Sequence, residues 1–162
     1  MKITALEEYG LRCLLRVAEQ GDGGAIPAPT IAEQEGLSLS YTQKILRVLS
    51  KGGLVDSRRG VQGGYFLARS AEEITVGDAI RVLGGMFQVE EICERHTGEL
   101  EACARRCNCR IRPVWAHISS FVVATLDGIS LAVLMNDDTA VARHLEECLP
   151  TFDESALSAP AS

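Results

Sequence analysis

The sequence predicts a mainly α-helical fold with one small β-hairpin, because three patterns follow one another along its 162 residues. Two short helical patterns flank a turn within residues 30–52, and a glycine-rich hairpin pattern follows over residues 54–67. A long apolar helical face then begins at Ile111. A hairpin directly behind a helix-turn-helix is a wing, so the predicted fold class is a winged helix-turn-helix, mainly α with a small β-wing, followed by a long dimerisation helix.

The first element is a helix over residues 4–18 that ends toward a glycine-containing loop. Its apolar residues recur close to the helical period: Leu6, Leu11, Leu14, Leu15 and Val17. Cys13 falls within this pattern and is therefore expected in the core.

Capping-box pairs predict where the next two helices begin. Thr30 is followed three residues later by Glu33, and Ser40 is followed three residues later by Gln43. Gly36 is expected to end the earlier of the two helices, and the later one should stop near the glycine pair at residues 52–53. Two short helices joined by a few residues form a helix-turn-helix.

Two short strands are predicted next, over residues 54–58 and 65–67, around a turn that contains Gly60, Gly63 and Gly64. Glycine lets such a turn adopt positive φ values and approach another backbone closely. A further helix is expected over residues 75–83.

Beyond residue 110, one face of a helix carries apolar side chains at three-to-four spacing, and Pro113 fits its first turn. These residues are Ile111, Val114, Trp115, Ile118, Phe121, Val122, Thr125 and Ile129. Because the face is longer than a small domain can cover by itself, a homodimer through this helix is favoured over an intrachain core helix.

Composition limits the classes of protein that remain. No apolar run reaches the roughly 18 residues that span a bilayer, and the amino-terminal residues contain no apolar stretch of a signal peptide. We therefore expect a cytoplasmic protein without a membrane partner, in which six cysteines serve metal or redox chemistry more often than disulfides. No Cys-x-x-Cys pair, nucleotide loop or nucleophile–base pairing is visible, so no enzyme and no small-molecule substrate is expected.

Charge is distributed unevenly although the net charge is −6. Residues 38–69 contain six basic side chains and one acidic side chain, whereas residues 71–162 contain seven basic and fifteen acidic ones. A local basic stripe can bind phosphates even on an acidic protein, so double-stranded DNA is the expected partner.

The second helix of a helix-turn-helix enters the major groove with its first residues near the base edges. The candidate DNA-binding residues there are Ser38, Ser40, Tyr41, Gln43, Lys44 and Arg47. The Gln43 amide matches the donor and acceptor of adenine, and completing the capping box is an equally good reading of the same residue.

Arg58, Arg59 and Gln62 lie at the predicted wing tip, where long side chains can reach the minor groove. A winged helix can also be a protein-interaction module, but the clustered basic residues favour DNA. If each subunit neutralises about four phosphates, a plot of the logarithm of the dimer's affinity against the logarithm of salt concentration should have a slope of about −7.

Four cysteines lie close together in a polar stretch: Cys93, Cys103, Cys107 and Cys109. Soft, anionic thiolates are the preferred ligands of iron–sulfur clusters. A zinc site, a thiol–disulfide switch and inert thiols are the alternatives, and the spacing is unlike the paired Cys-x-x-Cys of zinc ribbons. Cys148 has no evident partner.

The order of these motifs resembles the IscR/NsrR-type (Rrf-type) family of winged-helix, iron–sulfur transcriptional regulators. The matching stretches are Met1-Lys2-Ile3-Thr4, Tyr9-Gly10-Leu11-Arg12, Ile31-Ala32-Glu33, Leu39-Ser40-Tyr41, Leu54-Val55, Arg59-Gly60, Gly63-Gly64-Tyr65, Ile74-Thr75 and Cys109 to Trp115. They cover about the first 135 residues.

The resemblance implies that Cys93, Cys103 and Cys109 hold a 2Fe–2S or 4Fe–4S cluster. Cys107 is an addition to the family pattern and an alternative ligand. In some members a histidine three residues beyond the third cysteine is the fourth ligand; here that residue is Arg112, which cannot ligate. In others it is a carboxylate near the amino terminus of the partner subunit, a position that Glu8 occupies.

The resemblance also implies a mechanism and a division of the chain. Iron supply, redox state or nitric oxide would act on the cluster and so change operator binding, with the protein expected to act as a repressor. The predicted segments are a DNA-binding domain (1–84), a cluster-binding loop (85–110), a dimerisation helix with a helical region (111–149), and a tail expected to be disordered (150–162).

Overall fold

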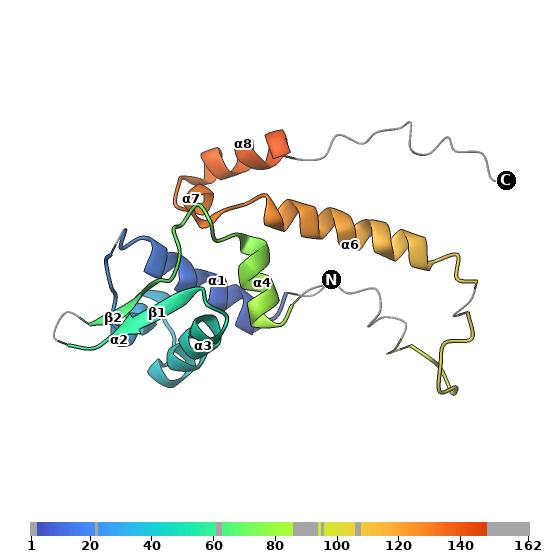
Figure 1. Ribbon diagram of the computed structural model, residues 1–162, viewed down its shortest axis with the longest axis horizontal. Coiled ribbons are helices and arrows are strands. Elements are labelled where there is room, and N and C mark those ends of the chain that lie inside the picture. Colours follow the sequence, from blue (N-terminus) through green and yellow to red (C-terminus); the bar gives the residue numbers. More distant parts are fainter. Residues whose placement is uncertain are drawn as a thin grey trace.

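A computed structural model describes residues 3–21, 23–60, 63–85, 94, 96–105 and 108–148. Its described elements are mainly helical, with one two-stranded antiparallel sheet (Figure 1). The helices are α1 (Ala5–Ala18), α2 (Ala28–Glu35), α3 (Leu39–Lys51), α4 (Val76–Leu83), α6 (Arg112–Asp127), α7 (Leu131–Leu134) and α8 (Asp138–Cys148). The strands are β1 (Val55–Arg58) and β2 (Gly64–Leu67), so the predicted fold class is confirmed.

Helix α1 begins with a complete capping box. The Thr4 hydroxyl accepts the Glu7 N–H, while the Glu7 carboxylate accepts the Thr4 N–H at 2.6 Å. Two of the amide groups that a helix start leaves without partners are satisfied in this way. Cys13, Leu14 and Val17 lie on the buried face of α1, which confirms that Cys13 is a core residue.

Helix α2 begins earlier than the sequence predicted. Pro27 is its N-cap and Pro29 lies in its first turn, so Thr30 is inside the helix and caps nothing. The capping box predicted for Thr30 and Glu33 is therefore wrong, because a proline in the first turn already has the helical φ and needs no amide partner. Gly36 ends the helix in the left-handed conformation at φ +66°, as predicted.

Helix α3 also begins before its predicted cap. Ser38 is the N-cap, and its hydroxyl accepts the Tyr41 N–H at 3.3 Å. The predicted pairing of Ser40 with Gln43 is wrong, since Ser40 already lies in the first helical turn. The Thr42 hydroxyl donates to the Ser38 carbonyl, which further fixes the start at Ser38.

The wing is the β1–β2 hairpin, with Val55 opposite Leu67 and Arg58 opposite Gly64. An isolated bridge joins Ile26, in the loop before α2, to Tyr65 on β2 through two backbone hydrogen bonds of 2.9 Å. The β2 edge of the hairpin is thereby joined to the loop that precedes α2.

One main core joins α1, α3, β1, α4 and α7. Its largest fully buried side chains include Leu14, Ile45, Leu46, Ile74 and Leu131. Because Leu131 of α7 is completely buried there, the chain after α6 returns to the amino-terminal domain. Two backbone hydrogen bonds reinforce this return: one joins Val76 N–H to the Ile129 carbonyl at 2.8 Å, and the other joins Leu131 N–H to the Ile74 carbonyl at 2.9 Å.

Helix α6 is fixed at its carboxyl end and extends away from the core (Figure 1). Arg81 of α4 donates a hydrogen bond to Asp127 at the end of α6. The Asp127 carboxylate packs against Gly77, where an added Cβ would lie 1.8 Å from Oδ1. No residue of α6 is fully buried, and the exposed apolar side chains lie in and just before its first half: Ile111, Val114, Trp115 and Ile118.

The carboxylate of Glu35, at the end of α2, forms the ion pairs that join the helix-turn-helix to α1. Arg12 Nε lies 2.6 Å from Glu35 Oε2 and Arg16 Nε lies 2.5 Å from Glu35 Oε1. Burial by itself raises a carboxyl pKa, but the hydrogen bonds from Arg16 and Arg12 outweigh it and hold the pKa of Glu35 below its ordinary value.

We predict that Glu35→Gln lowers the free energy of unfolding at pH 7 by about 1–3 kcal/mol, because it leaves two arginines without the buried charge that pairs them. A carboxylate with a lowered folded-state pKa stabilises the fold above its unfolded pKa of about 4.3 and loses that contribution as pH falls through the folded value. Urea unfolding of both proteins at pH 7 and below pH about 4 should show the difference shrinking at low pH.

The control is Glu19→Gln, since Glu19 contacts Arg16 on the surface and should change stability little. Equal unfolding free energies of Glu35→Gln and the wild type at pH 7 would contradict the structural role of Glu35.

Candidate nucleic-acid interface and metal centre

The outer face of α3 is polar and basic. Its buried face consists of Thr42, Ile45, Leu46 and Leu49, and the helical period places the remaining side chains toward solvent. Exposed on that surface are Ser40, Gln43, Lys44, Arg47 and Lys51. Four of the predicted DNA-binding residues therefore share one accessible face: Ser40, Gln43, Lys44 and Arg47.

The basic side chains of this face are not neutralised locally. Within the described part of the chain, no carboxylate lies within ion-pair distance of Lys44, Arg47, Lys51 or Arg59; the ion pairs there belong to Arg12, Arg16, Arg69 and Arg81. Arg47 Nε donates to the Gln43 carbonyl at 3.1 Å, one turn back on α3. A positive surface without internal counterions attracts phosphates.

The amino end of α3 is held from beneath by aromatic side chains. Tyr41 is half-buried, and its ring meets that of Tyr9 of α1 edge-on, with centroids 6.2 Å apart. The Arg12 guanidinium lies 5.5 Å from the centre of the Tyr9 ring. Tyr41 therefore anchors the start of α3 and also lies near the predicted interface. At the surface, the hydroxyls of Ser38 and Ser40 lie 3.3 Å apart.

The two wing arginines lie in different environments. Arg58 donates a hydrogen bond to the Gly23 carbonyl at 2.7 Å and lies 5.7 Å from the centre of the Phe66 ring. It thus ties the wing to the loop between α1 and α2, a role that sequence patterns did not suggest. Arg59 is exposed at the tip, and Gln62 lies outside the described residues.

Two of the four clustered cysteines are described. Cys103 and Cys109 are half-buried free thiols, whereas Cys93 and Cys107 lie outside the described residues. In the ranges that the structure describes, no three His, Cys, Asp or Glu side chains come together as a metal site. The predicted ligand set consequently stays a prediction.

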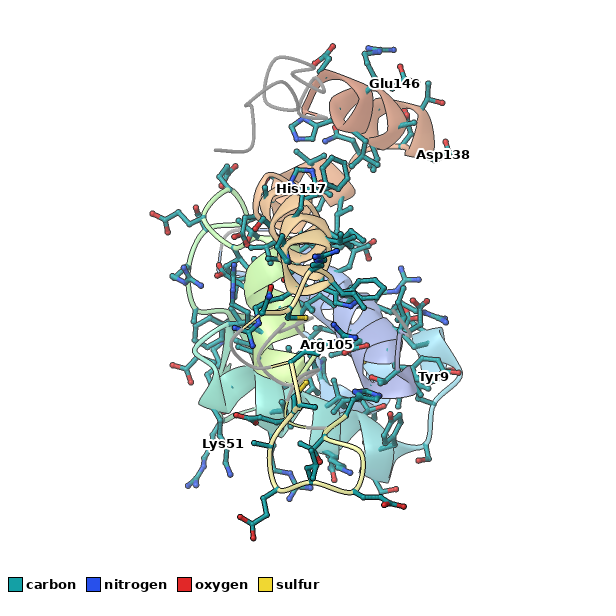
Figure 2. All side chains as sticks on the ribbon, turned by 90° about the vertical axis from the view of Figure 1, so that its right-hand side faces the viewer. Tyr9, Lys51, Arg105, His117, Asp138 and Glu146 are labelled. Atoms are coloured by element: carbon teal, nitrogen blue, oxygen red, sulfur yellow. The ribbon has the colours of Figure 1, made fainter. Side chains whose placement is uncertain are left out.

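Cys109 occupies a position that favours a thiolate. The backbone N–H groups of Ile111 and Arg112 lower the pKa of its thiol, and the charges of Arg112 and Arg105 add to the effect. Figure 2 shows Arg105 in the loop that leads into α6, on which His117 is labelled. By contrast, burial and the nearby Glu35 charge raise the pKa of the Cys13 thiol to about 11. The donor chemistry at Cys109 therefore suits ligation of a cationic centre, and that of Cys13 does not.

The structure also distinguishes the two acidic candidates on α1. Glu7 is buried, accepts the Thr4 N–H, and packs so closely against Gly85 that an added Cβ would lie 1.3 Å from its Oε1. Glu8 is exposed, and among the described residues its carboxylate has no hydrogen-bond or ion-pair partner. Of the two carboxylates, Glu8 is the one available to ligate a metal.

One exposed residue was missed by sequence reasoning. Leu39, which precedes the helix start predicted at Ser40, is the first residue of α3 and is 41% exposed. The available signal was an apolar residue between two serines directly before a helical pattern.

No described helix is long and apolar enough to cross a membrane.

Comparison with known proteins identifies related chains along most of the sequence. The family model described as Rrf2, "Iron-dependent Transcriptional regulator", matches residues 3–137. The protein rrf2 of Nitratidesulfovibrio vulgaris is 36% identical over 137 residues, which cover 85% of this chain and 89% of the relative. The HTH-type transcriptional regulator IscR of Aliivibrio salmonicida is 36% identical over 138 residues, covering 85% of this chain and 79% of the relative.

Solved structures agree with these matches. IscR of T. potens is 29% identical, covers 96% of each chain and superposes with a TM-score of 0.66. CymR of B. subtilis, described as the global cysteine regulator, is 31% identical and covers 85% of this chain and 99% of its own, with a TM-score of 0.60. An oxidised form of CymR from Staphylococcus aureus is 31% identical, covers 85% of this chain and 98% of its own, and gives a TM-score of 0.65.

Proposed function

Because the chain belongs to the Rrf2 family of iron-dependent transcriptional regulators, we propose that it is a cytoplasmic, homodimeric repressor whose operator binding is controlled by an iron–sulfur cluster. It is a winged-helix transcriptional regulator of the IscR and CymR type, a class of DNA-binding proteins and not of enzymes. The observation that carries the DNA-binding part of the proposal is the exposed basic face of α3, together with the exposed Arg59 of the wing, with no acidic partner in the described part of the chain.

In the proposed complex, α3 enters the major groove and the wing follows the neighbouring phosphates. Lys44 and Arg47 contact phosphates, while the Gln43 amide reads an adenine edge. Arg59 and Gln62 reach toward the minor groove. Arg58 keeps its bond to the Gly23 carbonyl and so holds the wing at the angle that this contact needs.

The exposed apolar side chains of α6 supply the dimer contact. Ile111, Val114, Trp115 and Ile118 are each at least 39% exposed and recur at the helical spacing of three to four residues. Pairing this face with its copy would bury it, and the two α3 helices would then be related by a two-fold axis. Such dimers bind half-sites about one DNA turn apart.

Cys93, Cys103 and Cys109 would hold the cluster, with the partner subunit's Glu8 as the fourth ligand and Cys107 as an alternative. A bound cluster, 2Fe–2S or 4Fe–4S, supplies an iron centre that is sensitive to iron supply, oxidation and nitric oxide. The amide groups at the start of α6 lower the pKa of the Cys109 thiol and so favour its thiolate, and Arg105 and Arg112 would offset negative charge. A cluster whose protein ligands come from both subunits would bind well to only one arrangement of the dimer. This difference in affinity between the two arrangements is what would let the cluster control DNA binding.

A metal-free thiol regulator is the second candidate function. The similarity to an oxidised form of CymR favours it, and the described Cys103 and Cys109 of this chain are free thiols that could be oxidised. Thiol chemistry would then take the place of the cluster at the same loop.

We predict that Lys44→Ala combined with Arg59→Ala weakens binding to operator DNA and makes it less dependent on salt. If each side chain contacts one phosphate, a dimer loses four contacts and the log–log slope falls in magnitude by about 3.5. Fluorescence anisotropy of a labelled duplex across a salt series measures both quantities. Arg69→Ala is the matched control, because Arg69 is paired with Asp78 away from α3; a double variant that keeps the wild-type slope would refute the interface.

We predict that protein purified without oxygen is brown and contains iron and sulfide. Single changes of Cys93, Cys103 or Cys109 to Ala should abolish the visible absorption, because each removes a thiolate ligand. Glu8→Ala should shorten the lifetime of the colour in air without removing it. Cys13→Ala is the control, since Cys13 is buried in the core. A colourless wild type without iron or sulfide would exclude the cluster and favour the thiol regulator.

A further inference from the structure

Leu39 is a large, exposed apolar side chain at the start of α3, at the edge of its polar face. It is 41% exposed at the first position of α3, and its neighbours in sequence are Ser38 and Ser40. Its sequence neighbours Leu37 and Tyr41 pack against the main core, but Leu39 belongs to neither hydrophobic cluster. The fold therefore gains little from an apolar residue at this position.

The helix start fixes the direction of this side chain. Ser38 caps α3 through the Tyr41 N–H, so Leu39 has helical geometry from the first residue. Residues four apart are neighbours on a helix surface, which places Leu39 beside Gln43. Both are exposed, and both lie at the end of α3 that a helix-turn-helix directs at base edges.

The dimer contact proposed above does not explain Leu39. In Figure 1, α3 lies below α4 while α6 lies above it, so α4 separates the two helices in this view. A partner subunit that pairs along α6 leaves Leu39 uncovered.

The major groove contains one apolar feature that such a side chain can contact, the 5-methyl group of thymine. Cytosine carries only a hydrogen at that ring position, so it offers an apolar side chain no methyl group to contact. An apolar side chain at this point therefore distinguishes thymine from cytosine, and an amide next to it can read adenine.

We infer that Leu39 is a specificity-determining residue that packs on the 5-methyl group of an operator thymine, beside the base read by Gln43. This inference rests on the proposed DNA-binding function and adds the base that the helix start recognises. Since burial of one methyl-sized group is worth about fourfold in affinity, loss of the methyl should weaken binding by about that factor for each half-site.

The test uses the full-length protein and an operator that it selects from a pool of random duplexes. Each thymine of that operator is replaced in turn by deoxyuridine, which lacks only the methyl group. Affinities are measured for the wild type, Leu39→Ala and Leu39→Met, with circular dichroism as a check on folding. Met135→Ala is the matched control, because Met135 is 42% exposed and lies just after α7, away from α3.

The expected result is one thymine position per half-site at which deoxyuridine weakens wild-type binding about fourfold. Leu39→Ala changes both subunits, so it should weaken binding to the thymine operator about sixteenfold, the product of the two single deoxyuridine effects, and each replacement should then cost nothing more. Leu39→Met, which keeps an apolar side chain of similar reach, and Met135→Ala should both retain the preference.

The inference is overturned if no thymine position matters, or if deoxyuridine weakens Leu39→Ala as much as the wild type. The wild type alone decides the first of these, so the test stands even if a variant folds poorly. Failure to select any duplex would instead overturn the proposed function, and the inference with it.

Discussion

The carboxylate that Arg12 and Arg16 share is the contact on which the geometry of the DNA-facing side depends. Glu35 ends α2, and only three residues separate it from the first residue of α3. Fixing Glu35 on α1 therefore limits where α3 can begin. Arg12 also stacks on the ring of Tyr9, which meets Tyr41 in the first turn of α3. One layer of polar and aromatic contacts thus sets the position of the proposed recognition helix relative to α1.

The same core also holds the carboxyl end of α6, whose other end leads to the proposed cluster-binding loop. Asp127 at the end of α6 is bonded to Arg81 of α4, and the backbone after it pairs with that before α4. The opposite end of α6 begins three residues after Cys109, beside the amides that lower the pKa of its thiol. A change in how the cysteine loop or the proposed dimer contact holds α6 would therefore act on a helix that is joined to the core of the DNA-binding domain.

Local signals predicted much of the fold, and distant contacts account for most of what they missed. Thr4 and Thr75 cap α1 and α4 because each has an acidic partner three residues on, and the same pattern misled at Thr30, where Pro29 already starts the helix. The bonds of Glu35 and Arg58 join residues 19 to 35 positions apart, which no spacing rule indicates. For the cysteines, sequence identifies candidate ligands by their chemistry, but their grouping depends on the path of the loop and on a second subunit.

Coupling between the cysteine loop and DNA is the central claim, and one comparison tests it most directly. The affinity for the selected operator is measured anaerobically, at one salt concentration, before and after a chelator removes iron from the same preparation. A regulator of this kind should change its affinity by about 5- to 150-fold, the usual range of coupling between two sites. Identical binding curves for the loaded and the stripped protein would contradict control by a cluster, whatever the colour of the preparation.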